Sequence, residues 1–418
     1  MTASPPDLDL ERLQRRTITS LRLMQIPGQA AVAGVVAVVA LLASDLVGSD
    51  RLAGVGNAGA TFGAALMAVP LASMMRRRGR RPALVSAFAV GSLGAAVAAF
   101  GGEIESLSVF ILGMLMFGSG QAGALQSRYT AADLAPVESK ASAISSVVWV
   151  GTLGAAFGPL LTPWEKDLAE FIGLSALVGP FVAASIFFAV SALVAWIRLR
   201  PDPLVISGGI HSLGTSIPLR RQVRESITAI RESHLAMVGV TAMVISQATM
   251  VAVMTMTPPH MKDHGHADLS APVVALHIVG MYGFSPWIGR FTDRVGRLRA
   301  IEIGAVVLGG GIVSTVIAGY VPALMFVGLL LLGVGWSIGL IAGTTLVSES
   351  VRAETKVEVQ GTADLAMSFF GGAAAFASGF VKQSFGFHLL ADSSAILAGM
   401  LLVIVWSTRV RVRSRSIA

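Results

Sequence analysis

The 418 residues are 54% hydrophobic and 13% charged, with a mean hydropathy of +0.73, which is far more apolar than an average soluble domain. The net charge of +7 sits in short basic clusters between apolar runs, which argues against a nucleic-acid-binding surface and is typical of membrane loops. The sequence has no cysteine, which excludes disulfides, thiolate metal sites and cysteine nucleophiles. We therefore expect a polytopic membrane protein.

Twelve apolar runs are each about long enough to cross a hydrocarbon core of roughly 30 Å. They lie near residues 19–44, 53–75, 82–101, 106–129, 141–163, 172–197, 235–257, 269–288, 300–319, 322–346, 359–381 and 389–408. An even number of spans puts both termini on one side of the membrane. If that side is the cytoplasm, only four of the 31 Lys and Arg residues fall outside, namely Arg51, Lys166, Lys262 and Lys382. The charge bias thus predicts a multi-pass protein of the cell (inner or plasma) membrane with both termini cytoplasmic.

The longest non-apolar segment divides the chain into six spans and six spans. We expect the following order: a cytoplasmic segment 1–18, a six-helix bundle 19–197, a cytoplasmic linker 198–234, a second bundle 235–408 and a basic tail 409–418. A single offset of 217 residues relates Gly79 to Gly296 and carries the span starts 19, 82 and 141 to within one residue of 235, 300 and 359. This shared offset predicts two related halves.

The loop from Gly289 to Arg299 carries four arginines and one aspartate between two apolar runs. Gly289 lets two helix ends approach closely, and Gly296 permits a turn with positive φ. Asp293 can accept hydrogen bonds from the free N–H groups at a neighbouring helix start, and the arginines can meet anionic lipid head groups. The alternative is a generic basic loop on the cytoplasmic side.

The matching loop positions are Gly289, Asp293, Arg294, Gly296 and Arg297, and they resemble the signature G-x-L-a-D-R-x-G-R-k of the major facilitator superfamily. A second segment, residues 132–136 followed by Lys140, is similar to the superfamily's a-D-l-x-P-x-x-x-R, with lysine in place of arginine. The first-half loop departs from the pattern, because Arg76 stands at the aspartate position and Ala72 at the first glycine position.

This resemblance implies an all-α integral membrane protein with twelve transmembrane helices in two pseudo-symmetric six-helix bundles, the major facilitator fold. The halves would rock around a central cavity near the bilayer midplane. The resemblance also implies that the protein works as a monomer.

The span at 141–163 contains Gly151, Gly154, Gly158 and Pro159. Glycines spaced three and four apart form a flat face that admits a neighbouring helix, and the proline bends the segment. This is similar to the glycine-proline motif of drug:proton antiporters, although Thr162 and Pro163 replace its closing Gly-Gly; simple helix packing is the alternative. The arginine of a second antiporter motif is missing, because Met114 occupies its position.

Five polar residues suggest a gate and a proton site. We expect Arg128 and Asp133 to form a structural pair, with Asp293, that holds the cytoplasmic gate shut. Asp364 lies about five residues inside a span and should therefore face the interior with a partner or a proton; it is a candidate for the coupling proton, or else a helix-end acid favoured by the helix dipole. His277, near the middle of its span, is a second proton-coupling candidate, or is held structurally by a carbonyl.

Six residues are candidates for a substrate cavity: Gln247, Met250, Met254, Gln121, Asn57 and Tyr282. Met243, Met250, Met254 and Met261 form a stripe on one span, which suits an adaptable apolar pocket but is also common in plain packing. The run His260, His264, His266 with Asp263 and Asp268 looks like a metal-ligand cluster. We interpret it as a solvated polar loop, and so predict no metal site.

No phosphate-binding loop, catalytic triad or H-E-x-x-H motif is present, so we expect neither an enzyme nor a cofactor. The expected function is secondary active transport, namely proton-coupled efflux (antiport) of small amphipathic or hydrophobic compounds. Its partners would be a small-molecule substrate, protons and a bilayer with anionic lipid at the cytoplasmic loops, and no nucleic acid. The alternatives are proton-coupled uptake of a polar nutrient or metabolite, divalent metal export, or a non-transporting membrane sensor.

Overall fold

The computed structural model describes residues 9–47, 55–208, 218–266, 269–317 and 321–417, and its regular structure there is entirely helical. The first half of the molecule comprises α1 (Leu10–Val47), α2 (Val55–Arg78), α3 (Arg80–Glu103), α4 (Leu107–Ala131), η2 (Val137–Ser139), α5 (Lys140–Phe171), η3 (Ala176–Val178) and α6 (Gly179–Arg198). Short α7 (Pro203–Ile206) and amphipathic α8 (Leu219–Glu232) belong to the connection between the halves.

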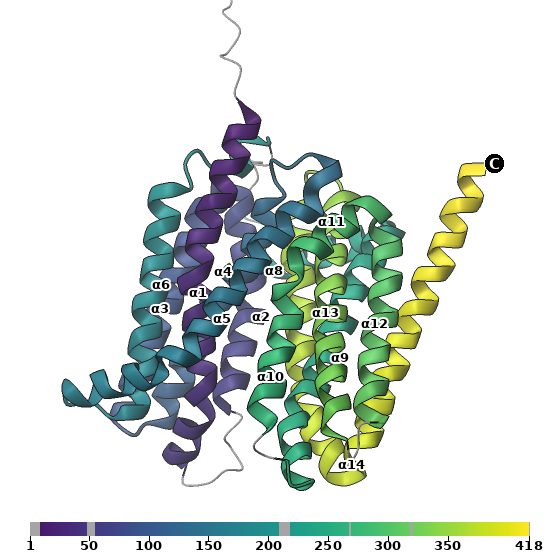
Figure 1. Cartoon of the computed structure of the whole chain (residues 1–418). Coiled ribbons are helices and arrows are strands. Elements are labelled where there is room, and N and C mark those ends of the chain that lie inside the picture. The colour runs from purple at the N-terminus through teal and green to yellow at the C-terminus, as the bar shows by residue number, and fades with distance from the viewer. Residues whose placement is uncertain (1–8, 48–54, 209–217, 267–268, 318–320, 418) are drawn as a thin grey trace, which may run out of the picture.

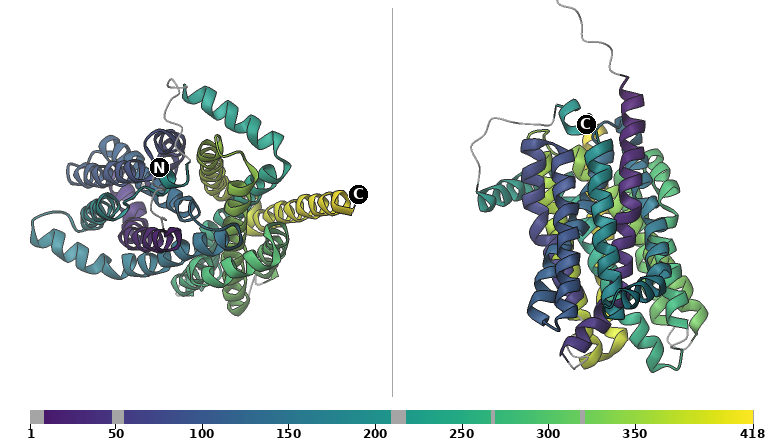
Figure 2. Two further views of the ribbon diagram at one scale, coloured as in Figure 1. Left: turned by 90° about the horizontal axis from the view of Figure 1, so that it is seen from above. Right: turned by 90° about the vertical axis from the view of Figure 1, so that its left-hand side faces the viewer.

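The second half comprises α9 (His234–Asp263), α10 (Ser270–Ile278), η5 (Val279–Gly283), α11 (Ser285–Val295), α12 (Arg297–Ile317), α13 (Pro322–Ser350) and α14 (Lys356–Ile417). The two halves stand side by side both in the front view and in the view from above (Figure 1 and Figure 2). The start of α1 and the end of α14 lie at the same end of the bundle (Figure 1). We call this the basic end, because the loops that carry Arg76–Arg81 and Arg290–Arg299 also lie there.

Ten helices among the described residues are long and apolar enough to span a membrane, and a bent α1 raises the number to 11. The remaining predicted span, 269–288, is built from α10, the π-helical turn η5 and α11, so no single helix of sufficient length covers it. The fold is the predicted one, with twelve spans in two halves. The predicted ends are less accurate: α5 continues eight residues beyond 163, and the last two spans form one element, α14, that is broken where Gly386 adopts a φ of +85°.

Each half has its own apolar core. In the first half, five phenylalanines are fully buried, and the rings of Phe117 and Phe188 lie 5.0 Å apart. Large apolar side chains such as Leu66, Phe376 and Ile396 are exposed on the outside of the bundle, as expected for a surface that faces lipid. The halves meet along two helix pairs, α2 with α14 and α5 with α11, which enclose the space between the bundles.

Candidate functional site: a central cavity and the gate above it

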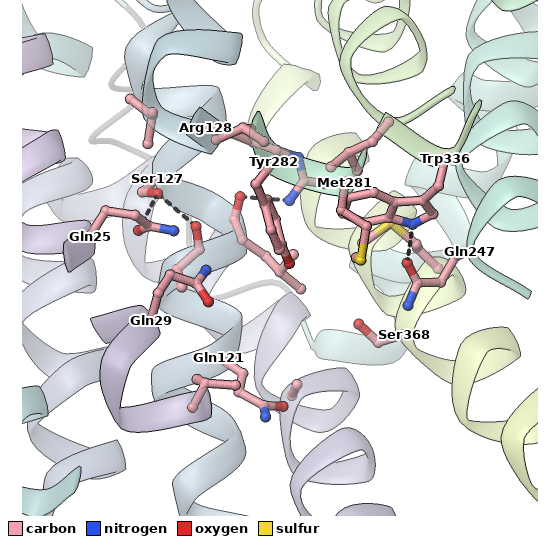
Figure 3. Close-up of a pocket in the computed structure, with 18 of the residues that line it drawn as sticks. Gln25, Gln29, Gln121, Ser127, Arg128, Gln247, Met281, Tyr282, Trp336 and Ser368 are labelled. Carbon is pink, nitrogen blue, oxygen red and sulfur yellow. Dashed lines mark hydrogen bonds between the residues drawn. The ribbon is translucent and has the colours of Figure 1, made fainter. Parts of the chain in front are cut away.

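A cavity of about 260 Å³ lies between the two halves and is lined by both of them. Figure 3 shows its polar wall, which contains four glutamines: Gln25 and Gln29 from α1, Gln121 from α4 and Gln247 from α9. Each amide can both donate and accept hydrogen bonds. Arg128 adds a positive charge to the wall, and Thr61, Ser127 and Ser368 add hydroxyl groups. The rest of the wall is apolar or aromatic and includes Val147, Val148, Leu340 and Met367. The cavity therefore suits a compact ligand with an apolar body and a hydrogen-bonding edge.

Two of the four amides are already engaged. Gln247 Oε1 accepts a 2.7 Å hydrogen bond from the indole N–H of Trp336, and Gln25 Oε1 accepts one of 3.0 Å from the Ser127 hydroxyl. Gln29 and Gln121 make no side-chain hydrogen bond to any residue in the described ranges. Their amides remain available to a ligand.

An aromatic pair forms one side of the cavity. The rings of Tyr282 and Trp336 meet edge to face, with centroids 5.8 Å apart and an interplanar angle of 81°. Tyr282 reaches the cavity because the π-helical turn η5 adds a residue to the helical repeat at this point. Such rings offer a flat surface on which another aromatic ring can stack.

Four of the six predicted cavity residues line it: Gln121, Gln247, Met250 and Tyr282. The prediction is wrong for Met254, which packs into the core of the second half, because it lies one helical turn beyond Met250. It is also wrong for Asn57, which is exposed. Its neighbour Gly56 lies on the buried face of α2, against Val39 and Phe110, and Asn57 points away from that face.

The prediction omitted Gln25, Gln29 and Trp336. A usable signal existed for the two glutamines, because polar side chains four residues apart inside an apolar span share one helix face and tend to point into the protein. For Trp336 nothing in the sequence distinguished a cavity tryptophan from one facing lipid. Its position depends on how α13 packs against α9.

An ion pair joins the halves at the top of the cavity. Arg128 of α4, which also lines the cavity, donates from Nη2 to Asp364 of α14. Both side chains are no more than 3% exposed. Gln126 donates a 3.0 Å hydrogen bond to the second carboxylate oxygen, and Arg128 also donates to Thr344 Oγ1 at 3.1 Å. Asp364 thus faces the interior with a partner, as predicted, and is not a solvent-facing helix-end acid.

The predicted pairing of Arg128 with Asp133 is wrong. Asp133 lies beyond the end of α4 and forms a bidentate pair with Arg80 at the start of α3, at 2.8 and 3.1 Å. Arg128 lies inside α4 on the face that points toward the other half, so its partner is Asp364. Arg80 in turn donates a 2.8 Å hydrogen bond to Gln360 Oε1 across the interface.

The loop from Gly289 to Arg299, which resembles the superfamily signature, also joins the halves at the basic end, where it contacts the start of α5. Asp293 accepts hydrogen bonds from the backbone N–H groups of Ala141 and Ser142 at the start of α5, at 3.1 and 2.8 Å. A side chain at Gly289 would place its Cβ 2.1 Å from Ser145 Oγ, so only glycine allows this approach of α11 to α5. Gly296 has a φ of +85°. These are the contacts expected from the sequence.

Arg297 extends this network. It pairs with Glu349 at 3.0 Å and with Asp293 at 3.4 Å, and it also donates to the carbonyl of Val137 in the first half. Arg294 is exposed on the same surface. The offset of 217 maps Arg80 onto Arg297, and the two arginines hold corresponding ion pairs in the two halves.

The first-half loop, which departs from the superfamily pattern, uses different chemistry for the same contact. Arg76, at the aspartate position, pairs with Glu358 at the start of α14. Here the glycine that allows the two helices to approach closely lies on α14 and not on α2, because a Cβ at Gly361 would lie 2.4 Å from Ala72 Cβ. In the second half, an aspartate accepts hydrogen bonds from the start of a neighbouring helix. In the first half, an ion pair between α2 and α14 takes the place of that contact.

Among the described residues, the hydrogen bonds and ion pairs between the halves use first-half residues from Arg76 to Ser142 only. Those residues belong to the basic-end portions of α2, α3, α4 and α5 and to the loops beside them. The structure is therefore closed at the basic end. We refer to Arg76, Arg80, Arg128, Asp293 and Asp364, with their partners, as the gate.

Two glycines of α5, Gly154 and Gly158, serve contacts within the first half. A Cβ at Gly154 would lie 2.5 Å from the carbonyl oxygen of Ile26, and one at Gly158 would lie 2.8 Å from that of Ala30, so both pack tightly against α1. This close approach is the helix packing that the sequence allowed as an alternative to an antiporter motif. The side chain of Pro159 lies outside the described residues.

His277 is buried between α10 and α13 and does not line the cavity. Its Nδ1 lies 2.8 Å from the carbonyl oxygen of Leu329, which is the bond expected for a structural histidine. Its Nε2 is buried without a hydrogen-bond partner among the described residues.

The run that begins at His260 was interpreted as a solvated polar loop, but its first residues are helical. His260 lies inside α9, is 5% exposed and stacks on Phe387, with ring centroids 4.1 Å apart. The helix continues through Pro258 and Pro259 to residue 263 and ends before Gly265, which has a φ of +78°. No group of three metal-ligating side chains occurs among the described residues, which leave out Asp268 and the side chain of Asp263.

Comparison with known proteins gives a consistent picture. The family model described as Major Facilitator Superfamily matches residues 24–376. The chain is 36% identical over 403 residues to YddS of Bacillus subtilis (strain 168), described as an uncharacterized MFS-type transporter, covering 95% of this chain and 92% of that one. It is 30% identical over 380 residues to RfnT of Brucella anthropi, described as a riboflavin transporter, covering 87% and 90%.

Solved structures share the fold at low identity. FucP, a transporter in the outward conformation, aligns with a TM-score of 0.70 and 15% identity over 93% of this chain and 97% of that one. The human organic anion transporter MFSD10 aligns with a TM-score of 0.71 and 15% identity over 96% and 100%.

Proposed function

Since the chain belongs to the Major Facilitator Superfamily and is a transporter rather than an enzyme, we propose that it exports a small amphipathic aromatic compound in exchange for protons. The observation that carries this proposal is the double role of Arg128, which both lines the cavity and pairs with Asp364 across the gate. A ligand in the cavity and a proton on Asp364 would therefore act on the same contact.

The proton step follows from the charge of the pair. Protonation of Asp364 removes the negative charge that holds Arg128, so one of the attractions that close the basic end is lost. The halves can then rock and expose the cavity at the basic end, which we assign to the cytoplasm from the loop charges. Release of the proton there restores the carboxylate and, with it, the closed state. The proton gradient would supply about 2.3 kcal/mol per charge moved through 100 mV.

The substrate class follows from the wall of the cavity. The edge-to-face pair Tyr282 and Trp336 suits a flat aromatic body, and the free amides of Gln29 and Gln121 suit a rim that carries both donors and acceptors. A purely hydrophobic compound would leave these amides without partners, at a cost of about 1–3 kcal/mol each. The similarity to RfnT, described as a riboflavin transporter, supports a heteroaromatic substrate.

Import of a polar heteroaromatic nutrient is the second candidate, and the amide-rich wall favours it. It uses the same cavity and gate but requires the proton and the substrate to move in the same direction. The direction of flux relative to the proton gradient separates the two candidates.

The substrate class can be tested by calorimetric titration of the purified protein with riboflavin, an aromatic lipophilic cation, an aliphatic amphiphile and a sugar. We expect binding of the aromatic compounds, and about tenfold weaker binding in the Trp336→Leu variant. The control is Trp164→Leu, which removes an exposed tryptophan outside the cavity lining. Equal binding of the aliphatic amphiphile, or no effect of Trp336→Leu, would rule out the proposed substrate class.

A further inference from the structure

A second groove lies on the outside of the first half, at the basic end, between the start of α3 and the end of α6. It has a volume of about 600 Å³ and shares no lining residue with the central cavity. Its wall contains three arginines, Arg78, Arg81 and Arg200, together with Trp196 and Asp202. None of these side chains takes part in the proposed transport cycle.

The groove carries a net positive charge within the described part of the chain, because its three arginines face one carboxylate, that of Asp202. Arg78 forms no hydrogen bond or ion pair there. Arg81 and Arg200 each donate only their Nε–H, to the carbonyl oxygen of Trp196, at 3.0 and 3.3 Å, so their terminal N–H groups remain free. The guanidinium of Arg200 also lies over the Trp196 ring, 5.6 Å from its centroid.

Asp202 offsets one of the three positive charges but leaves the terminal N–H groups of the arginines free. Its two carboxylate oxygens accept hydrogen bonds from the backbone N–H groups of Arg81 and Leu204, at 2.7 and 2.9 Å. It therefore acts as a cap for the starts of α3 and α7 and forms no ion pair with an arginine of the groove. Three guanidinium groups that line one groove and keep free N–H donors are suited to bind phosphate.

The surface next to the groove is apolar and faces outward. Four large side chains of α6 are 41–58% exposed, at intervals of four, three and four residues, and so form one stripe along the helix: Ile186, Val190, Leu193 and Ile197. Trp196, at the upper end of this stripe, is 52% exposed, as is common for tryptophan at a membrane interface. A positive pocket above an apolar stripe matches the shape of a phospholipid.

We propose that this groove binds the phosphate of an anionic phospholipid, whose acyl chain lies along the exposed stripe of α6. The arginines hold the phosphate and the stripe holds the chain, so a free phosphate ion would use only half of the site. The groove also lies next to the gate, because Arg78 and Arg81 flank Arg80, which pairs with Asp133. A bound lipid would thereby steady the turn that carries Arg80; this consequence rests on the proposed gate, whereas lipid binding does not.

Native mass spectrometry of the full chain in detergent tests the proposal, with phosphatidylglycerol, phosphatidylcholine and inorganic phosphate as separate probes. We expect phosphatidylglycerol to bind more tightly than phosphatidylcholine and to raise the unfolding temperature. Each arginine near a membrane surface contributes about 1 kcal/mol, so Arg78→Gln should weaken phosphatidylglycerol binding about fivefold. Replacing Arg78, Arg81 and Arg200 together by Gln should weaken it about a hundredfold.

The matched control removes the same charge elsewhere. Arg12, Arg15 and Arg16, also replaced by Gln, lie at the start of α1, which stands above the bundle (Figure 1). This variant should bind phosphatidylglycerol as the parent does. Equal losses in the two triple variants, equal binding of phosphatidylcholine, or the same thermal stabilisation by inorganic phosphate would each overturn the proposal. If the triple groove variant does not fold, Arg78→Gln decides alone, because that side chain makes no described contact that the fold needs.

Discussion

Replacing Asp364 by Asn should open the gate at the basic end. The change leaves Arg128, which is 2% exposed, as a buried charge without its partner. Removing one partner of a buried ion pair costs about 3–5 kcal/mol. Because Arg128 keeps its bonds to Thr344 and to the carbonyl of Leu125, the lower figure is the better one. About 3 kcal/mol corresponds to about 150-fold, so a closed-to-open ratio of about 100:1 would fall to about 1:1.

The assay is a distance measurement between two spin labels, one on each half. Because the chain contains no cysteine, Arg77→Cys and Ala353→Cys give two specific attachment points. Both residues are exposed at the basic end, at the end of α2 and between α13 and α14. We expect one short distance in the parent at neutral pH and an additional longer distance of similar population in the Asp364→Asn variant.

Two controls make this result specific. Asp364→Glu keeps the charge and should stay largely closed, and Asp167→Asn removes an exposed acid that takes no part in the gate. Acidification should lengthen the distance in the parent and leave the Asp364→Asn variant unchanged. The reasoning is refuted if the parent and Asp364→Asn give the same distance distribution at every pH.

Three further predictions concern single residues. Gly289→Ala would place a methyl group 2.1 Å from Ser145 Oγ, so it should destabilise the closed state by about 1–3 kcal/mol and lengthen the same label distance. Gln247→Leu leaves the Trp336 indole N–H without its acceptor and should weaken aromatic ligands about tenfold in calorimetry, whereas Met254→Leu should not. Burial raises the pKa of Glu165, which lies beyond the apolar span of α5, from 4.5 to about 7. Between these pH values the folded state binds a proton that the unfolded chain has lost, so the free energy of unfolding should fall as the pH rises from 4.5 to 7. In thermal unfolding, Glu165→Gln should remove this dependence on pH.

The fold could be predicted from the sequence because a bilayer allows few solutions. Apolar runs of fixed length must be helices, and loop charge orders them. The loop at Gly289 and Asp293 could be predicted in detail because its contacts are local and depend on backbone geometry: a close approach, a positive φ and the cap of a neighbouring helix. These requirements leave recognisable residues at fixed spacings.

The partners of buried charges could not be predicted in the same way. Arg128 is five residues from Asp133 but 236 residues from Asp364, and only the packing of α4 against α14 decides between them. The same is true of Trp336, which meets Gln247 from a different helix. The π-helical turn that brings Tyr282 into the cavity also leaves no clear mark in the residue pattern. Contacts distant in sequence therefore set the site, although its glutamines were visible as polar residues inside apolar spans.

Proton movement in everted membrane vesicles tests the central claim most directly. The vesicles are energised to an acid interior, the gradient is followed with a pH-sensitive dye, and riboflavin, aromatic lipophilic cations, aliphatic amphiphiles, sugars and zinc are added in turn. Our account predicts that aromatic amphipathic compounds dissipate the gradient in vesicles with the parent protein and not in those with Asp364→Asn. No dissipation by any compound, or the same dissipation with Asp364→Asn, would contradict proton exchange through the Arg128–Asp364 gate.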